Sequence, residues 1–213
     1  MPTPLHTRID TPMDATGARV LAEAWTLGGR QGLWLRRAVL IALGIALLVL
    51  AAKVRVPFWP VPMTMQTFAV LSIGAAFGPR LGGATLLGYL ALGAIGLDVF
   101  TSSSATAYGL AYMMGGTGGY LLGFLMAAVL LGCLAERGWD RRPMRMMAAM
   151  VAGLVLVYLP GVLWLGHLYA DARGWAWVLE VGLTTFLPAE VLKVALAMVL
   201  FPALWRFVGP ARG

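Results

Sequence analysis

The chain has 213 residues, of which 60% are hydrophobic and 12% are charged, and its net charge is +7. Soluble domains carry about 25% charged residues, so this composition excludes a soluble domain and indicates an all-α integral membrane protein. The basic residues lie mainly in short loops beside apolar segments, which is typical of membrane topology and does not indicate a nucleic-acid partner. The single cysteine, Cys133, excludes an internal disulfide.

Residues 1–33 are expected to form a cytoplasmic extension. Asp10, Asp14 and Glu23 interrupt this stretch together with prolines and glycines, so it lacks the apolar run of a cleavable signal peptide.

The first apolar segment, at residues 35–52, carries a stripe of small side chains. Ala38, Ala42 and Ala46 recur at a spacing of four, which places them on one face of a helix. Small residues let helices approach closely in a membrane. The stripe therefore predicts either packing within the same bundle or a docking surface for another protein.

A loop rich in proline and aromatic residues follows at residues 53–62 and leads into Thr64 and Gln66. Proline keeps such a loop extended, and Trp59 stands within it. The loop can be a lid over a pocket. It can equally be an interfacial anchor, because Trp prefers the headgroup level of a membrane.

Two more apolar segments, at residues 65–77 and 81–97, are joined by a tight turn at 78–80. Tyr89 lies in the second of them, and its hydroxyl needs a hydrogen-bond partner if it faces inward.

Residues 98–116 are polar and irregular, and they include Ser102 and Tyr112. Loops of this length are uncommon unless they are functional or disordered, so we expect an exposed or re-entrant loop. A glycine-rich stretch with Thr117 then opens the next apolar segment. It lacks the Lys-Ser/Thr ending of a P-loop, which favours close backbone approach to a ligand or a helix.

The last apolar stretch, at residues 175–205, would be about 45 Å long as one helix, whereas the hydrocarbon core is about 30 Å thick. The ring of Pro188 would clash with the carbonyl of Thr184, so a helix stops or bends there. This predicts a short surface helix at residues 175–183 and a final span that begins near Pro188.

The sequence thus predicts six spans in a membrane domain of residues 34–207, followed by a tail at 208–213; the spans are 35–52, 65–77, 81–97, 118–136, 147–169 and 188–205. Arginine and lysine gather on the side that holds both termini, which the positive-inside rule places in the cytoplasm. The proline-rich loop, the serine-containing loop and the start of the last span then share the outer side. This predicts an outward-facing pocket.

Two opposite charges stand at the start of the last span. Glu190 and Lys193 are three residues apart, so they share one helix face and can touch. Ionisable groups at membrane depth usually face a bundle interior or a cavity. The pair is either an ion pair that locks two helices together or a ligand site that offers an acceptor beside a donor.

Four motifs in order resemble the BioY family, the biotin-binding S components of energy-coupling factor (ECF) transporters: VPFWPVPMTMQ at 56–66, GLDVF at 96–100, GTGGYLLGF at 116–124 and FLPAEVLK at 186–193. The resemblance covers about residues 38–205. Three positions depart from the family pattern. Glu190 stands where the family usually has Asp. Gly116 stands where the Gly-Pro-Thr-Gly-Gly motif has proline, and Asp98 stands at another position where proline is usual.

The resemblance implies a six-helix bundle in the bacterial cytoplasmic membrane that captures biotin from outside. It implies a transmembrane coupling subunit and two ABC ATPases as partners, with ATP used only by those partners and no cofactor or metal in this chain. It also assigns Ala38, Ala42 and Ala46 to the surface that meets the coupling subunit.

The chemistry of the residues fits this ligand. The ureido ring of biotin has N–H donors and a carbonyl acceptor, which match the Glu190 carboxylate and the Lys193 ammonium. Gln66, Tyr89 and Thr117 are expected as further binding residues. Loop residues expected near the pocket are Trp59, Thr64, Ser102 and Tyr112.

Two alternatives remain. One is an S component for a different vitamin. The other is a membrane enzyme that uses Glu190 as a general base, although the sequence has no nucleophile–base pair or metal-ligand cluster to accompany it.

Overall fold

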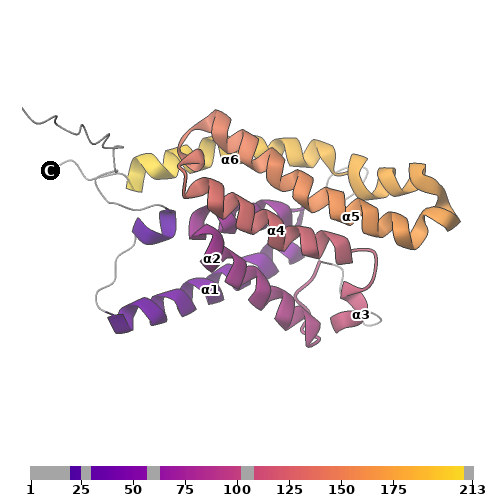
Figure 1. Ribbon diagram of the computed structural model, residues 1–213, viewed down its shortest axis with the longest axis horizontal. Coiled ribbons are helices and arrows are strands. Elements are labelled where there is room, and N and C mark those ends of the chain that lie inside the picture. The colour runs from indigo at the N-terminus through magenta and orange to yellow at the C-terminus, as the bar shows by residue number, and fades with distance from the viewer. Residues whose placement is uncertain (1–19, 25–29, 57–62, 102–107, 209–213) are drawn as a thin grey trace, which may run out of the picture.

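The computed structural model describes residues 20–24, 30–56, 63–101 and 108–208, and these residues form a bundle of long helices (Figure 1). Its elements in chain order are α1 (Arg30–Lys53), β1 (Arg55–Val56), β2 (Met63–Thr64), α2 (Gln66–Ala94), α3 (Gly109–Met113), α4 (Gly118–Ala135), α5 (Pro143–Leu179) and α6 (Leu187–Val208). Two 3₁₀ turns, Leu21–Ala24 and Trp139–Arg141, and one π-helical turn, Glu180–Thr184, complete them. The all-α prediction is confirmed apart from the two-residue antiparallel ladder of β1 and β2.

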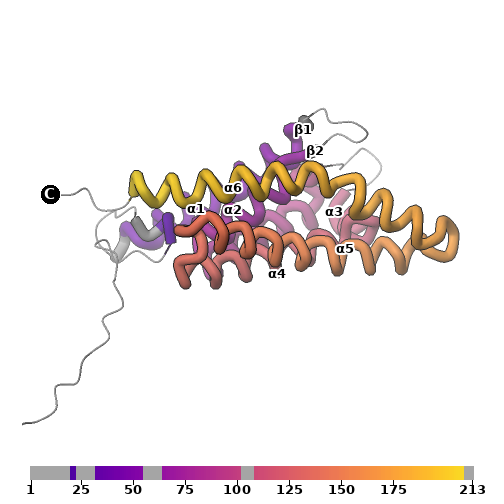
Figure 2. Tube along the Cα trace, turned by 90° about the horizontal axis from the view of Figure 1, so that it is seen from above, coloured from indigo at the N-terminus to yellow at the C-terminus, as the bar shows by residue number. Residues whose placement is uncertain are grey.

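Among the described residues, four helical runs are long and apolar enough to cross a membrane: Gly32–Lys53, Gln66–Ala94, Gly118–Ala135 and Pro143–Val208. The protein is therefore a multi-pass membrane protein. The C-terminal end of α6 and the turn of α5 lie at opposite ends of the long axis (Figure 1), and α4 and α5 run along the side opposite the β1–β2 ladder (Figure 2).

The helix α2 folds back on itself at Gly78. This glycine has φ 80° and ψ 173°, a conformation that side chains disfavour, and Pro79 follows it. Gln66 and Tyr89 would be about 35 Å apart on a straight helix. Instead the Gln66 amide Nε2 lies 2.9 Å from the Tyr89 hydroxyl. The expected segments 65–77 and 81–97 thus fall on two antiparallel halves.

The last helical run, from α5 to α6, is broken twice. At Gly174, with φ 80°, the chain reverses, so that the ring of Trp177 returns to 5.9 Å from that of Tyr169. The chain bends again at Thr185 and Phe186, and Pro188 is the second residue of α6. Between the breaks, the Tyr120 hydroxyl donates to the Gly182 carbonyl at 2.7 Å, which ties the returning chain to α4.

The helix α4 packs between α2 and α5 through glycines. A Cβ added at Gly132 would lie 2.3 Å from the Pro79 nitrogen in α2. One added at Gly123 would lie 2.7 Å from the Val157 Cα in α5. Because both neighbours are backbone atoms, α4 contacts α2 and α5 at distances that only glycine permits.

The connector between α4 and α5 holds the end of α6. Asp140 is only 1% exposed, and the Trp205 indole Nε1 donates to its Oδ2 at 2.5 Å. The Arg141 guanidinium lies 4.3 Å from the centre of the Trp205 ring, within cation–π range. The basic loop therefore fixes the end of α6.

Gly123→Ala is expected to lower the free energy of unfolding by about 1–3 kcal/mol, because the added methyl meets the backbone of α5. Gly83→Ala is the matched control, since its Cβ would meet only the Val129 side chain, at 3.3 Å. Thermal unfolding in detergent measures both. Equal melting temperatures for the two variants would contradict this account of the α4–α5 contact.

Burial of Asp140 raises its pKa from 3.8 to about 6, although the hydrogen bond from Trp205 lowers it. Since the folded state binds this proton more tightly, its contribution to stability is full below about pH 4 and is lost as pH rises through about 6. The loss is about 3 kcal/mol. Asp140→Asn keeps an acceptor for Trp205 and removes the titrating group. In this variant the melting temperature should change less between pH 4 and 7 than in the wild type. An unchanged slope in this variant would show that another group titrates.

Candidate ligand-binding site

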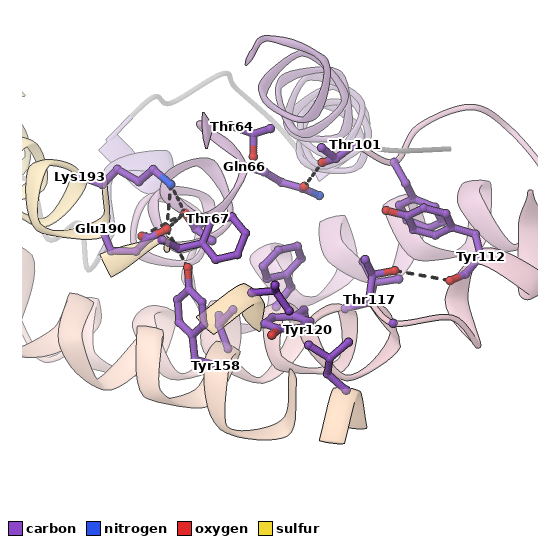
Figure 3. A pocket seen from close by; sticks show the side chains of 18 of the residues that line it. Thr64, Gln66, Thr67, Thr101, Tyr112, Thr117, Tyr120, Tyr158, Glu190 and Lys193 are labelled. Carbon is purple, nitrogen blue, oxygen red and sulfur yellow. Dashed lines mark hydrogen bonds and ion pairs between the residues drawn. The ribbon is translucent and has the colours of Figure 1, made fainter. Parts of the chain in front are cut away.

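A cavity of about 570 Å³ lies among α2, α4, α5, α6 and the segment that leads to α3 (Figure 3). Its lining is charged at the start of α6, and elsewhere it combines polar, aliphatic and aromatic side chains. The lining residues are Thr64, Gln66, Thr67, Phe100, Thr101, Tyr112, Gly116, Thr117, Tyr120, Leu121, Phe124, Val157, Tyr158, Leu165, Tyr169, Trp177, Val181, Phe186, Glu190 and Lys193.

A buried ion pair forms the polar part of the wall. Glu190 and Lys193 stand in the first turns of α6, with the Lys193 Nζ 2.8 Å from the Glu190 Oε1. The two residues are 3% and 6% exposed. The break before α6 puts this pair at the beginning of a helix, where both side chains face the cavity.

Two hydroxyl groups form hydrogen bonds with the ion pair (Figure 3). The Thr67 Oγ1 accepts from the Lys193 Nζ at 2.7 Å and donates to the Glu190 Oε1 at 2.9 Å. The Tyr158 hydroxyl donates to the same Oε1 at 3.1 Å. Burying two charges costs several kcal/mol per ion unless further hydrogen bonds satisfy them. Residues of α2 and α5 thus stabilise the charges of α6.

A second polar group lies beside the first. The Gln66 Oε1 accepts from the Thr101 hydroxyl at 2.6 Å, and its Nε2 donates to the Tyr89 hydroxyl at 2.9 Å. Tyr89 in turn donates to the Val99 carbonyl at 3.0 Å. This chain of bonds orients the Gln66 amide and ties the segment after α2 to the cavity wall.

Aromatic rings form much of the remaining wall. Phe100 stacks on Tyr112 with centroids 4.8 Å apart and planes 12° apart, and Tyr89 meets the edge of Phe100 at 5.4 Å. The Thr117 hydroxyl donates to the Tyr112 carbonyl at 3.5 Å, across the cavity from the ion pair (Figure 3). The site therefore combines a small polar wall with a broad apolar one, as small-molecule sites do.

Most of the residues singled out in the sequence meet at this cavity. Those that line it are Glu190, Lys193, Gln66, Thr117, Thr64 and Tyr112. Tyr89 is fully buried behind Gln66 and Phe100 and does not line the cavity itself. Trp59 and Ser102 lie outside the described residues. The stripe of Ala38, Ala42 and Ala46 is exposed on α1.

Sequence reasoning did not assign Thr67 and Tyr158 to the site. Each is a polar side chain within an apolar run, which signals a need for an internal partner. That signal does not identify the partner, however, because the partner lies more than 30 residues away in the chain. Within the described residues, no group of three His, Cys, Asp or Glu side chains is arranged to hold a metal ion.

Comparison with known proteins gives one consistent result. A family model described as the BioY family matches residues 19–210. The probable biotin transporter BioY of Pyrococcus horikoshii is 33% identical over 161 residues, which cover 76% of this chain and 91% of that protein. The biotin transporter BioY of Thermotoga maritima is 34% identical over 167 residues, which cover 76% and 92%.

The fold also matches a solved structure. The S-component for biotin from an ECF-type ABC transporter superposes with a TM-score of 0.66 at 22% identity, covering 84% of this chain and 95% of that one. At this identity the match shows the fold alone.

Thr67→Val is expected to lower the free energy of unfolding by about 1–3 kcal/mol, because it leaves a buried ion pair short of a donor and an acceptor. Thr64→Val is the control, since Thr64 lines the same cavity and lies outside the hydrogen-bond network of the ion pair. Thermal unfolding without ligand measures the difference. If Thr67→Val is as stable as Thr64→Val, the hydroxyl does not support the pair.

Proposed function

Because this chain belongs to the BioY family, we propose that it is the substrate-capture component of an uptake transporter and that its cavity binds biotin. The observation that carries the proposal is the buried pair of Glu190 and Lys193 in the wall of the cavity.

The pair retains bonding capacity for a ligand. An ammonium has three N–H donors. Among the described residues Lys193 uses two of them, on Thr67 and on Glu190. Within the same residues, the Glu190 Oε2 accepts only from Thr67, at 3.1 Å, and shares that hydroxyl proton with Oε1. One donor and one carboxylate oxygen thus remain for a group that has an acceptor beside a donor.

The ureido ring of biotin is such a group. Its N–H donates to the Glu190 carboxylate, and its carbonyl oxygen accepts from Lys193, so both bonds are charge-assisted. The Gln66 amide offers a further polar contact, and the stacked rings of Phe100 and Tyr112 offer an apolar surface for the thioether ring. The cavity volume lies in the range of small-molecule sites, roughly 300–1,000 Å³.

We place the chain in the membrane as six spans, because Gly78 divides α2 and the breaks at Gly174 and Thr185 divide the last run. The turn of α2 lies beside the connector after α4, since a Cβ on Gly78 would be 3.6 Å from Glu136. Asp140 joins this connector to the end of α6.

This end carries a group of arginines, in the turn of α2, the connector after α4 and the nearby ends of α5 and α6: Arg80, Arg137, Arg141, Arg142, Arg145 and Arg206. The positive-inside rule places it and both termini in the cytoplasm. The cavity then opens outward, in the cytoplasmic membrane of a bacterium.

The proposed partners are a transmembrane coupling subunit and two ABC ATPases of an ECF module. The exposed face of α1 with Ala38, Ala42 and Ala46 is the proposed docking surface for the coupling subunit, because small residues permit close helix contact. ATP is used by the partners, and this chain needs no cofactor. The relatives are named as transporters, which favours transport over an enzyme with Glu190 as its base.

Calorimetry with purified protein in detergent tests the proposal. Wild-type protein should bind biotin, whereas Glu190→Ala and Lys193→Ala should bind none detectably, since each removes one of the two charge-assisted hydrogen bonds to the ureido ring. Both variants should remain folded by circular dichroism.

Glu180→Ala removes an exposed carboxylate that does not line the cavity and should keep wild-type affinity. Wild-type affinity in both cavity variants would refute the site. Binding of a different vitamin in place of biotin would show that biotin is not the ligand, but it would still agree with a role in vitamin transport.

A further inference from the structure

The cavity has an exposed end at the turn of α5. Tyr169 and Val181 line it and are 39% and 37% exposed, and Trp177 lines it between them. Trp177 and Glu190 are 13 residues apart, and the chain between them bends at Thr185 and Phe186. The ion pair and Trp177 line the same cavity, so a ligand whose head meets the ion pair can extend its tail toward this turn.

Arg173 stands at that turn. Its guanidinium lies 5.2 Å from the centre of the Trp177 ring, and Tyr169 meets the same ring at 5.9 Å with planes 66° apart. Gly174, with φ 80°, reverses the chain between Arg173 and Trp177 and so brings the two side chains together. Stacking fixes the guanidinium plane and leaves its N–H groups available.

No carboxylate is paired with Arg173 among the described residues, although Asp171 and Glu180 are close in the chain. Two other cations of the described residues each have a carboxylate partner. Lys193 is bound to Glu190, and Lys53 forms an ion pair with Asp98 at 2.5 Å.

We propose that Arg173 binds the carboxylate of the ligand's valeryl tail, while Trp177 and Tyr169 form the slot for its methylene groups. The inference rests on the proposed function, because it takes biotin as the ligand. A carboxylate is costly to bury without a partner, so the tail must end at water or at a cation. Beside Trp177, which lines the cavity, Arg173 offers a planar pair of donors that matches a carboxylate.

The test compares biotin with biotin amide, which has the same ring and chain without the negative charge. Calorimetry in detergent gives the affinity of each ligand for wild type, Arg173→Gln, Arg173→Lys, Lys53→Gln and Arg80→Gln. Wild type should prefer biotin about tenfold, as expected for a hydrogen bond to a charged group. Arg173→Gln should lose that preference by binding biotin more weakly and the amide equally well.

The other variants separate the explanations. Arg173→Lys should keep part of the preference, and Arg80→Gln, at the turn of α2, should keep all of it. Loss of the preference in Lys53→Gln but not in Arg173→Gln would overturn the inference, as would an equal loss of both ligands in Arg173→Gln. If wild type binds neither ligand, the proposed function itself fails.

Discussion

The buried pair of Glu190 and Lys193 is the interaction on which the site depends. Two charges with a few per cent exposure are stable only when the groups around them supply hydrogen bonds. Thr67 from α2 and Tyr158 from α5 supply them, so three helices must meet at one point. The requirement to satisfy one ion pair thereby fixes the relative position of α2, α5 and α6, and these helices enclose the cavity.

The helix breaks serve this arrangement. Gly78 folds α2 so that Gln66 and Tyr89 meet, and the bend before Pro188 starts α6 at the cavity. α4 then packs against backbone on both sides, which leaves no room for side chains between the helices. The cavity lies where Phe100, Tyr112 and their neighbours line the space between the helices.

Several of these features were predictable from local sequence rules. The proline at 188 predicted the break before α6, and the spacing of Glu190 and Lys193 predicted that they touch. The need of Tyr89 for a partner was also predictable. Its partner Gln66, and the roles of Thr67 and Tyr158, depend on contacts between distant segments, which local patterns do not encode. The sequence predicts a loop between residues 169 and 175, but it does not identify Gly174 as the residue at which the chain reverses.

Two departures from the family pattern acquire a physical meaning here. Asp98, where proline is usual, pairs with Lys53 and so links the end of α1 to the segment that carries Phe100 and Thr101. Glu190, one methylene longer than the usual Asp, reaches both Thr67 and Tyr158.

Mass spectrometry of the intact protein, purified natively from cells supplied with biotin, tests the central claim most directly. The account predicts biotin bound to the wild-type chain in a one-to-one complex that disappears in Glu190→Ala. A wild-type chain that carries another small molecule, or a Glu190→Ala chain that still carries biotin, would contradict it.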